Sequence, residues 1–139
     1  MNRLYILLIL VVAFVSCDNN VWNELPQPIA SFVSEYYPDS KVSSYGDTSN
    51  GGHYVQIHNG AYLTFDSKDR WLSVNGNGAI LPQVFLFDEL PPSLYEYLQE
   101  TENLDLVYMA SRDNFKYELQ LKSSRLTYTI DSGRITGEI

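Results

Sequence analysis

The sequence predicts an α+β fold: two tandem units, each a helix followed by antiparallel strands, share one sheet with the helices on one face and the other face open. Apolar and polar residues alternate over residues 54–65 and again over 117–130, as half-buried strands do. A helical pattern precedes each segment, and its apolar positions recur at a constant step of 65 residues, with Ile29, Phe32 and Val33 matching Leu94, Tyr97 and Leu98.

The repeat units cover about residues 25–75 and 90–139, within one domain over residues 25–139. A unit of roughly 60 residues buries only about 60% of its chain surface and is marginal alone. We therefore expect the two units to continue one sheet. Helices that cover its apolar face would leave the other face free.

The first 17 residues have the pattern of an export signal. Arg3 supplies the positive start, and residues 4–15 form an apolar run that is short for a bilayer span. Cys17 is the only cysteine, so it has no disulfide partner within the chain. Its position resembles the lipidated cysteine of a bacterial lipoprotein signal, which predicts a membrane anchor at Cys17. The alternative is ordinary secretory cleavage near this residue. Residues 18–24 would form a tether.

Two helices are expected to begin at prolines, which the first helical turn tolerates. Leu25-Pro26-Gln27-Pro28 begins the first helix and Pro38 ends it. Leu90-Pro91-Pro92-Ser93 begins the second, whose buried stripe is predicted to hold Leu94, Tyr97 and Leu98. Residues 41–45 and 104–110 are the strands expected next.

An Asn-Gly pair marks the turn of the first hairpin. A two-residue loop would pair Gln56 with Leu63 and mix polar with apolar residues on one face, which a half-buried sheet resists. A three-residue loop over residues 58–60 pairs Val55 with Leu63 and gathers the apolar residues on one face. It suits a turn with Gly60 in the left-handed conformation, so we expect this register.

The second hairpin is expected to have a four-residue loop over residues 122–125, with a strand that continues to Ile130. Both hairpins are followed by an Asp-Ser pair, at Asp66 and Asp131, and these residues favour turns. Residues 80–87 are apolar, and we interpret them as a connector with a short helical turn after Pro82.

At these motifs the sequence resembles a known family. The repeated Leu-Pro-x-x-Ile/Leu-x-x-Phe/Tyr-Val/Leu helix, the Tyr-x-Val-x-Ile strand and the Phe-Asp-Ser-Lys-Asp-Arg-Trp hairpin are similar to those of the β-lactamase-inhibitor-like, PepSY-like proteins of bacterial cell envelopes. The resemblance covers about residues 25–139. It implies tandem α/β units with an exposed sheet face, which β-lactamase inhibitor proteins use to grip an enzyme. The second copy departs from the pattern at Thr101, where no Tyr-Pro pair ends the helix.

Composition and motifs argue against several functions. The formal net charge of −8 disfavours a nucleic-acid partner, because such proteins neutralise phosphates with Lys and Arg. His53 and His58, the two histidines, have opposite strand parity and cannot share a metal. The aspartates at 66, 69 and 131 lack calcium-loop spacing, and we find neither a phosphate loop nor a nucleophile elbow. We expect no catalytic residue, metal or cofactor.

The sequence thus predicts a non-enzymatic, envelope-anchored protein that binds a protein or peptide through the open sheet face. Tyrosines are favoured binding anchors, and two lie on this face by parity. One alternative is a small-ligand or envelope-sensing module with a pocket between sheet and connector; another is a hydrolase whose site assembles only in space. The candidate face consists of Tyr54, Gln56, Tyr62, Thr64, Glu118, Gln120, Thr127 and Thr129.

Overall fold

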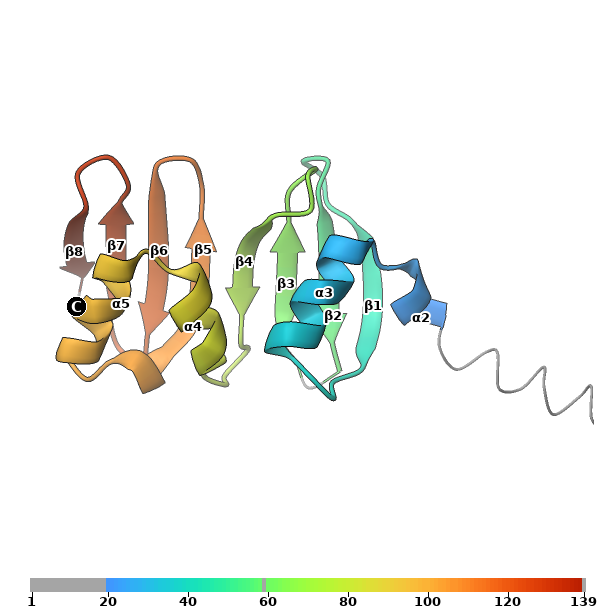
Figure 1. Ribbon diagram of the computed structural model, residues 1–139, viewed down its shortest axis with the longest axis horizontal. Coiled ribbons are helices and arrows are strands. Elements are labelled where there is room, and N and C mark those ends of the chain that lie inside the picture. The colour runs from blue at the N-terminus through green and yellow to red at the C-terminus, as the bar shows by residue number, and fades with distance from the viewer. Residues whose placement is uncertain (1–19, 59, 139) are drawn as a thin grey trace, which may run out of the picture.

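The strands form one antiparallel sheet in which each strand pairs with the next along the chain (Figure 1). The computed structural model describes residues 20–58 and 60–138. The strands are β1 (Val42–Asp47), β2 (His53–Ile57), β3 (Tyr62–Phe65), β4 (Trp71–Asn75), β5 (Val107–Arg112), β6 (Lys116–Leu121), β7 (Arg125–Thr129) and β8 (Arg134–Glu138). The helices are α2 (Asn20–Glu24), α3 (Gln27–Tyr36), α4 (Gln83–Glu89), α5 (Pro92–Glu100) and the 3₁₀ helix η1 (Leu104–Leu106).

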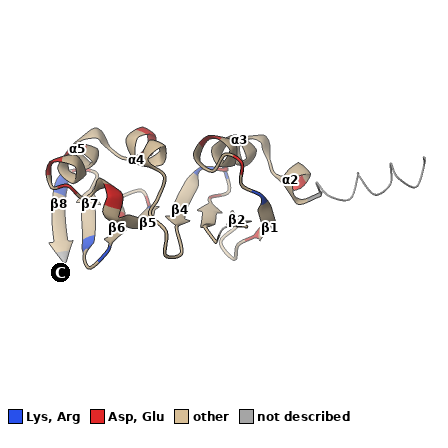
Figure 2. Ribbon diagram, turned by 90° about the horizontal axis from the view of Figure 1, so that it is seen from below, with Lys and Arg blue, Asp and Glu red and all other residues tan. Residues whose placement is uncertain are grey.

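The helices α3, α4 and α5 lie on the same side of the sheet. Figure 2 shows α3 above the N-terminal strands and α4 and α5 above the C-terminal strands, with the other face uncovered by any helix of the described residues. The expected α+β class and the single open antiparallel sheet are therefore confirmed.

Helix α3 follows its sequence signals closely. Pro26 is the N-cap residue, and a second proline occupies the first turn, where a missing N–H costs nothing. Ile29 and Val33, one turn apart, are buried against the sheet at 0% and 1% exposure. The helix ends at Tyr36, because helical backbone is disfavoured before a proline, and Tyr37, which precedes Pro38, has a φ of −129° and a ψ of 55°.

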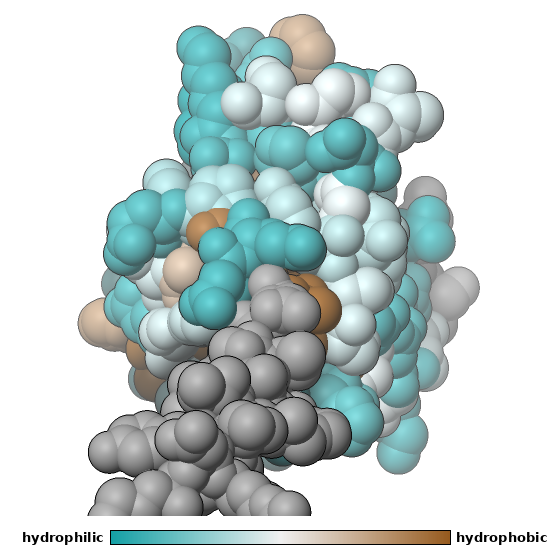
Figure 3. Space-filling view, turned by 90° about the vertical axis from the view of Figure 1, so that its right-hand side faces the viewer, coloured by the Kyte–Doolittle hydropathy of each residue, from teal (hydrophilic) through white to brown (hydrophobic). Residues whose placement is uncertain are grey.

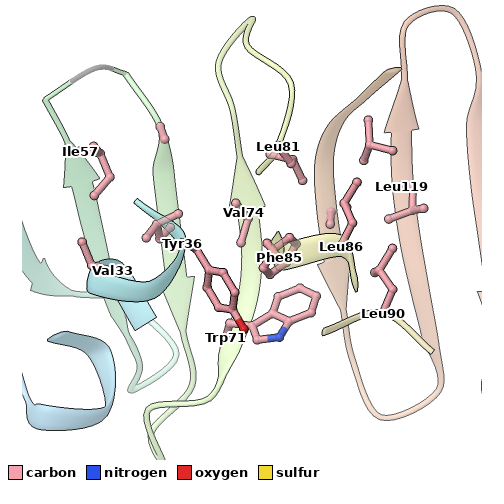
Figure 4. Packing of buried hydrophobic residues seen from close by; sticks show 14 of the residues in the cluster. Val33, Tyr36, Ile57, Trp71, Val74, Leu81, Phe85, Leu86, Leu90 and Leu119 are labelled. Carbon is pink, nitrogen blue, oxygen red and sulfur yellow. The ribbon is translucent and has the colours of Figure 1, made fainter. Parts of the chain in front are cut away.

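The connector helix α4 seals the core where the two halves of the sheet meet. Phe85 is fully buried, and its ring lies 5.0 Å from Trp71 of β4, 5.5 Å from Tyr36 and 5.9 Å from Phe32 of α3. Figure 4 shows the side chains of Tyr36, Trp71 and Phe85 close together, below Val74 in this view. These edge-to-face contacts add to the free energy of burial. The helical turn expected after Pro82 is thus confirmed, and it joins both halves into one core.

The register of the first hairpin is the predicted one. Val55 pairs with Leu63, and the Ile57 amide donates to the Ala61 carbonyl at 2.8 Å. Gly60 has a φ of +113°, in the region that favours glycine. The apolar residues of both strands share the helix-covered face, as the alternation requires.

The expected loop of the second hairpin is wrong. Leu119 pairs with Leu126 and Gln120 with Arg125, and the Leu121 amide donates to the Ser124 carbonyl, so only residues 122 and 123 remain between the paired positions. The register differs from the expected one by two residues. A shift by two leaves every side chain on the same face, so the apolar pattern could not distinguish the two registers.

Strand β7 also ends one residue earlier than expected. Ile130 lies in the turn that follows, 39% exposed, and its amide donates to the Phe115 carbonyl of the neighbouring turn at 2.8 Å. The side chain therefore sits at the rim of the sheet rather than in the core.

Two details of the helical segments differ from expectation. Tyr97 is 37% exposed, whereas Leu94 and Leu98, spaced by one turn, are fully buried. The expected strand over residues 104–110 begins only at Val107, since the Leu106 amide bonds to the Asn103 carbonyl and closes the 3₁₀ turn η1.

The structure describes the N-terminal segment of the chain only from residue 20 onward. Residues 20–24, expected to be a tether, form helix α2, which contacts β1. The predicted export signal and Cys17 lie outside the described residues. Within them, no helix is long and apolar enough to cross a bilayer. Seen from the β1 end, the surface coloured in Figure 3 is mostly hydrophilic, which suits an exposed sheet edge.

Candidate binding face

The eight candidate residues all lie on the uncovered face of the sheet. Strand pairing aligns the residues of this face in two rows, the first of which crosses all eight strands. One row contains Gly46, Tyr54, Thr64, Ser73, Ser111, Glu118, Thr127 and Thr136. The other contains Ser44, Gln56, Tyr62, Asn75, Met109, Gln120 and Arg125, and Thr129 lies beyond the first row on β7. Short polar side chains predominate, so two tyrosines stand out.

Tyr54 and Tyr62 stack on each other across β2 and β3. Their ring centroids are 5.6 Å apart with an interplanar angle of 16°. The Tyr54 ring also lies over Gly46 on β1, where a Cβ atom would come within 2.7 Å of Cε1 of Tyr54. An aromatic ring that covers a cross-strand glycine protects the backbone there and fixes the ring in turn. The pair therefore forms a flat, pre-positioned aromatic surface, half-buried among its neighbours.

The side chains of Gln56 and Gln120 form hydrogen bonds within their own hairpins. The Gln56 side-chain amide donates to the carbonyls of Ile57 and Ala61 at 3.1 and 3.0 Å. The Gln120 amide donates to the carbonyls of Leu121 and Ser124 at 3.0 and 3.2 Å, in the same position of the second hairpin. Each glutamine therefore fastens the end of a hairpin, a role that strand parity alone did not indicate.

Other candidate residues are also engaged with neighbours on the face. The hydroxyls of Thr64 and Ser73 lie 2.5 Å apart, across β3 and β4. Lys116 Nζ lies 2.7 Å from Glu118 Oε1, and this contact raises the pKa of the Lys116 ammonium. These pairs leave the tyrosine stack as the largest apolar feature among the candidate residues.

The histidines lie apart from each other. His53 Nδ1 is 3.0 Å from Asp47 Oδ1, and its Nε2 is 3.9 Å from Asp69 Oδ1, whereas His58 is exposed at the other end of β2. Among residues 20–58 and 60–138, no three His, Cys, Asp or Glu side chains gather as metal ligands. Asp66 is a turn residue, because its carboxylate accepts the amides of Lys68 and Arg70.

A cluster that the sequence did not reveal joins α3 to α4 on the helix side. The Tyr36 hydroxyl donates to Glu89 Oε1 at 2.8 Å and lies 3.2 Å from Asp88 Oδ2, while Trp71 Nε1 donates to Glu89 Oε2 at 3.0 Å. Burial and Glu89 raise the pKa of the Tyr36 hydroxyl, and desolvation and Asp88 raise the pKa of Glu35. Tyr36 lies more than 50 positions before its carboxylate partners, so no local motif marks the contact. The hydrogen bonds from the Tyr36 hydroxyl to Asp88 and Glu89 hold helix α3 against helix α4.

Comparison with known proteins finds solved structures with a similar fold. No protein-family model matches the sequence, and no curated protein sequence matches it. Three crystal structures, each of a protein named as a putative periplasmic protein, share the fold.

The first neighbour, from the DUF2874 family of Bacteroides vulgatus, has a TM-score of 0.72 and 23% identity over 85% of this chain and 93% of its own. The second, from Bacteroides thetaiotaomicron and named as calcium-regulated, has a TM-score of 0.71 and 24% identity over 85% and 93%. The third, from Bacteroides vulgatus and of unknown function, has a TM-score of 0.66 and 19% identity over 84% and 94%. At these identities the likeness shows the fold alone.

Proposed function

We propose that this protein is a non-enzymatic binding protein of the cell envelope, which holds a protein or peptide partner on the uncovered sheet face. The observation that carries the proposal is the stacked pair Tyr54 and Tyr62, fixed over Gly46 on a face that no described helix covers. Tyrosine offers apolar area and a hydroxyl at low cost in conformational entropy, so it anchors interfaces well.

The size of the face suits a macromolecular partner. Eight strands at a spacing of about 4.8 Å span roughly 34 Å, and five residues along a strand span roughly 17 Å. The resulting area of roughly 600 Å² is of the same order as the 800 Å² or so that each partner buries in a standard interface. A peptide segment or the edge of a protein fits this surface better than a small molecule does.

The location is part of the proposal. We place the protein outside the cytoplasm, held to a membrane by a lipid on Cys17. The export pattern of the first 17 residues supports this, and so do the names of the structural neighbours. Metabolic labelling with palmitate should mark the wild-type protein and leave Cys17→Ala unlabelled. A wild-type protein that is unlabelled and leaves the membrane fraction would contradict the anchor.

We also propose that the two halves are copies of one unit and that the protein belongs to the PepSY-like group, with its β-lactamase-inhibitor-like architecture. The glutamine contacts at positions 56 and 120 support the internal repeat, because they fasten equivalent hairpins. Inhibition of an envelope enzyme is one form that partner binding would take. Calcium, which the name of one neighbour mentions, has no part in the proposal, since no three His, Cys, Asp or Glu side chains of the described residues are placed to hold a metal ion.

The test is a quantitative capture of partners from envelope extract with the full-length protein as bait. The double variant Tyr54→Ala/Tyr62→Ala should bind the captured partner about tenfold more weakly or worse, as loss of two anchors implies. Tyr97→Ala is the matched control, because Tyr97 is exposed on the helix side. Equal binding by wild type and the double variant, or a loss of binding in Tyr97→Ala alone, would overturn the proposal.

A further inference from the structure

Three turns meet at one end of the sheet on the helix side, beyond the cover of the helices. They are the turns between β3 and β4, between β5 and β6, and between β7 and β8, all at the upper end in Figure 1. The last two are tied together by the hydrogen bond from the Ile130 amide to the Phe115 carbonyl. Between them lies a cavity of about 300 Å³, whose lining includes Trp71, Arg112 and Tyr117. This volume is within the range of small-ligand sites.

Arg112 is held in this cavity by two contacts with one residue. Its Nε donates to the Trp71 carbonyl at 2.8 Å, and its guanidinium carbon lies 4.1 Å from the centroid of the Trp71 ring. Trp71 is itself only 3% exposed and is fixed by Glu89. The guanidinium plane is therefore oriented before any ligand arrives, while the N–H groups of its two terminal nitrogens are not used in these contacts. A pre-oriented guanidinium matches the geometry of a carboxylate.

The acidic residues of the lining are already engaged elsewhere. The Asp66 carboxylate lies 2.9 Å from Arg70 Nε, and Asp113 Oδ1 accepts the amides of Phe115 and Lys116 at 2.7 and 2.9 Å. In the part of the chain that the structure describes, no carboxylate forms an ion pair with Arg112. Arg112 is thus a cation that stacks on an indole and has no ion-pair partner in these residues, in a protein with a formal charge of −8.

We propose that this cavity binds the C-terminal carboxylate of a peptide whose last residue is apolar. The carboxylate would pair with Arg112, and the apolar side chain would lie against Tyr117 and Ile130, whose own side chain is 39% exposed. The lining holds two arginines and two aspartates, so a monoanion suits it better than a phosphate dianion, which Asp66 and Asp113 would repel. The site lies on the helix side, goes beyond the proposed function and does not depend on the uncovered face.

The test uses the fluorescence of Trp71, isolated by Trp22→Phe, since the sequence has two tryptophans. N-acetyl-Ala-Leu with a free carboxylate should shift the emission saturably, and its C-terminal amide should bind at least tenfold more weakly. Arg112→Gln should weaken binding of the free acid at least tenfold, and Arg112→Lys should restore only part of it. Arg125→Gln, the same change on the other face of the sheet, should bind as the Trp22→Phe protein does.

Equal binding of the acid and the amide, or saturable binding of neither, overturns the proposal, and this comparison needs no variant at Arg112. Equal binding by Arg112→Gln, shown to be folded by its thermal transition, also overturns it. A third ligand, 4-methylpentanoate, carries the same apolar group without a peptide bond. If it binds as tightly as the dipeptide, the site takes free carboxylic acids and the assignment to a peptide terminus is wrong.

Discussion

Tyr54 is fixed on the uncovered face by the residue opposite to it. Gly46 has no side chain, so the tyrosine ring lies flat on β1 and meets Tyr62 on the other side. A glycine in a strand often marks such a close approach. Strand parity predicted the face on which the two tyrosines lie, but nothing in the sequence predicted the glycine, because the register of β1 against β2 depends on a bulge between Val42 and Ser44.

Gly46→Ala should displace the Tyr54 ring, because the new Cβ would lie 2.7 Å from its Cε1. The backbone at this position is not left-handed, so alanine itself is tolerated there, and the free energy of unfolding should change by less than about 1 kcal/mol. Ring-to-ring nuclear Overhauser contacts between Tyr54 and Tyr62 should disappear. Ser44→Ala, on the same strand and face, should keep them, and a Gly46→Ala protein that retains them would refute the described packing.

A second prediction at this scale concerns pH. Burial raises the pKa of Asp66, but the hydrogen bonds from Arg70 and Lys68 outweigh it and hold the pKa below its usual value. The contribution of the carboxylate to stability is therefore complete above the unfolded pKa of about 3.9 and is lost as pH falls through the lower folded pKa.

Asp66→Asn should accordingly lower the free energy of unfolding at pH 7 by about 1–2 kcal/mol, as loss of charge-assisted hydrogen bonds does. The difference from wild type should shrink as the pH falls below about 4. Urea midpoints across this pH range check it. Asp131→Asn, an exposed turn aspartate, is the control and should differ from wild type by less than about 0.5 kcal/mol. If the stability difference between wild type and Asp66→Asn grew as the pH fell, the pKa of Asp66 would be shifted in the opposite direction.

At the scale of elements, the two hairpins explain what a sequence can and cannot predict. In the first, the competing registers differ by one residue, which would turn Leu63 to the opposite face, so the apolar pattern selects the correct one. In the second, the registers differ by two residues and keep Leu119 and Leu126 on the same face either way. The register of the second hairpin then depends on turn geometry and on the hydrogen bonds of Gln120. The alternation of apolar and polar residues carries no information about either.

Leu63→Ala should cost about 2–5 kcal/mol in free energy of unfolding, because Leu63 is fully buried and its truncation leaves a cavity. Thr64→Ala, its neighbour on the other face, should cost about 1 kcal/mol for the hydrogen bond to Ser73. Denaturant midpoints of the two variants give the ranking. If Thr64→Ala proved less stable than Leu63→Ala, the face of the sheet assigned to the core would be wrong.

The whole molecule depends on the junction between the two halves of the sheet. Phe85 from the connector contacts α3 and β4 at once, so the core runs through both halves without a break. The sequence predicted a helical turn after Pro82, but a short apolar run does not show which of its side chains faces the core. Phe85 is buried, whereas Phe87, two positions on, is 67% exposed.

Phe85→Ala should therefore destabilise the protein by about 3–5 kcal/mol, as truncation of a buried aromatic does. Phe87→Ala is the matched control and should change the free energy of unfolding by less than about 0.5 kcal/mol. Calorimetry of the wild type should show one cooperative transition for both halves. Two resolved transitions, or equal effects of the two variants, would contradict a continuous core.

The central claim is that the uncovered face binds the partner, and hydroxyl-radical footprinting of the complex tests it most directly. Oxidation of Tyr54 and Tyr62 should fall when the partner binds, whereas oxidation of Tyr97 and Phe87, both exposed on the helix side, should stay the same. The reverse pattern, with the two tyrosines of the uncovered face unprotected and the helix side protected, would contradict the account.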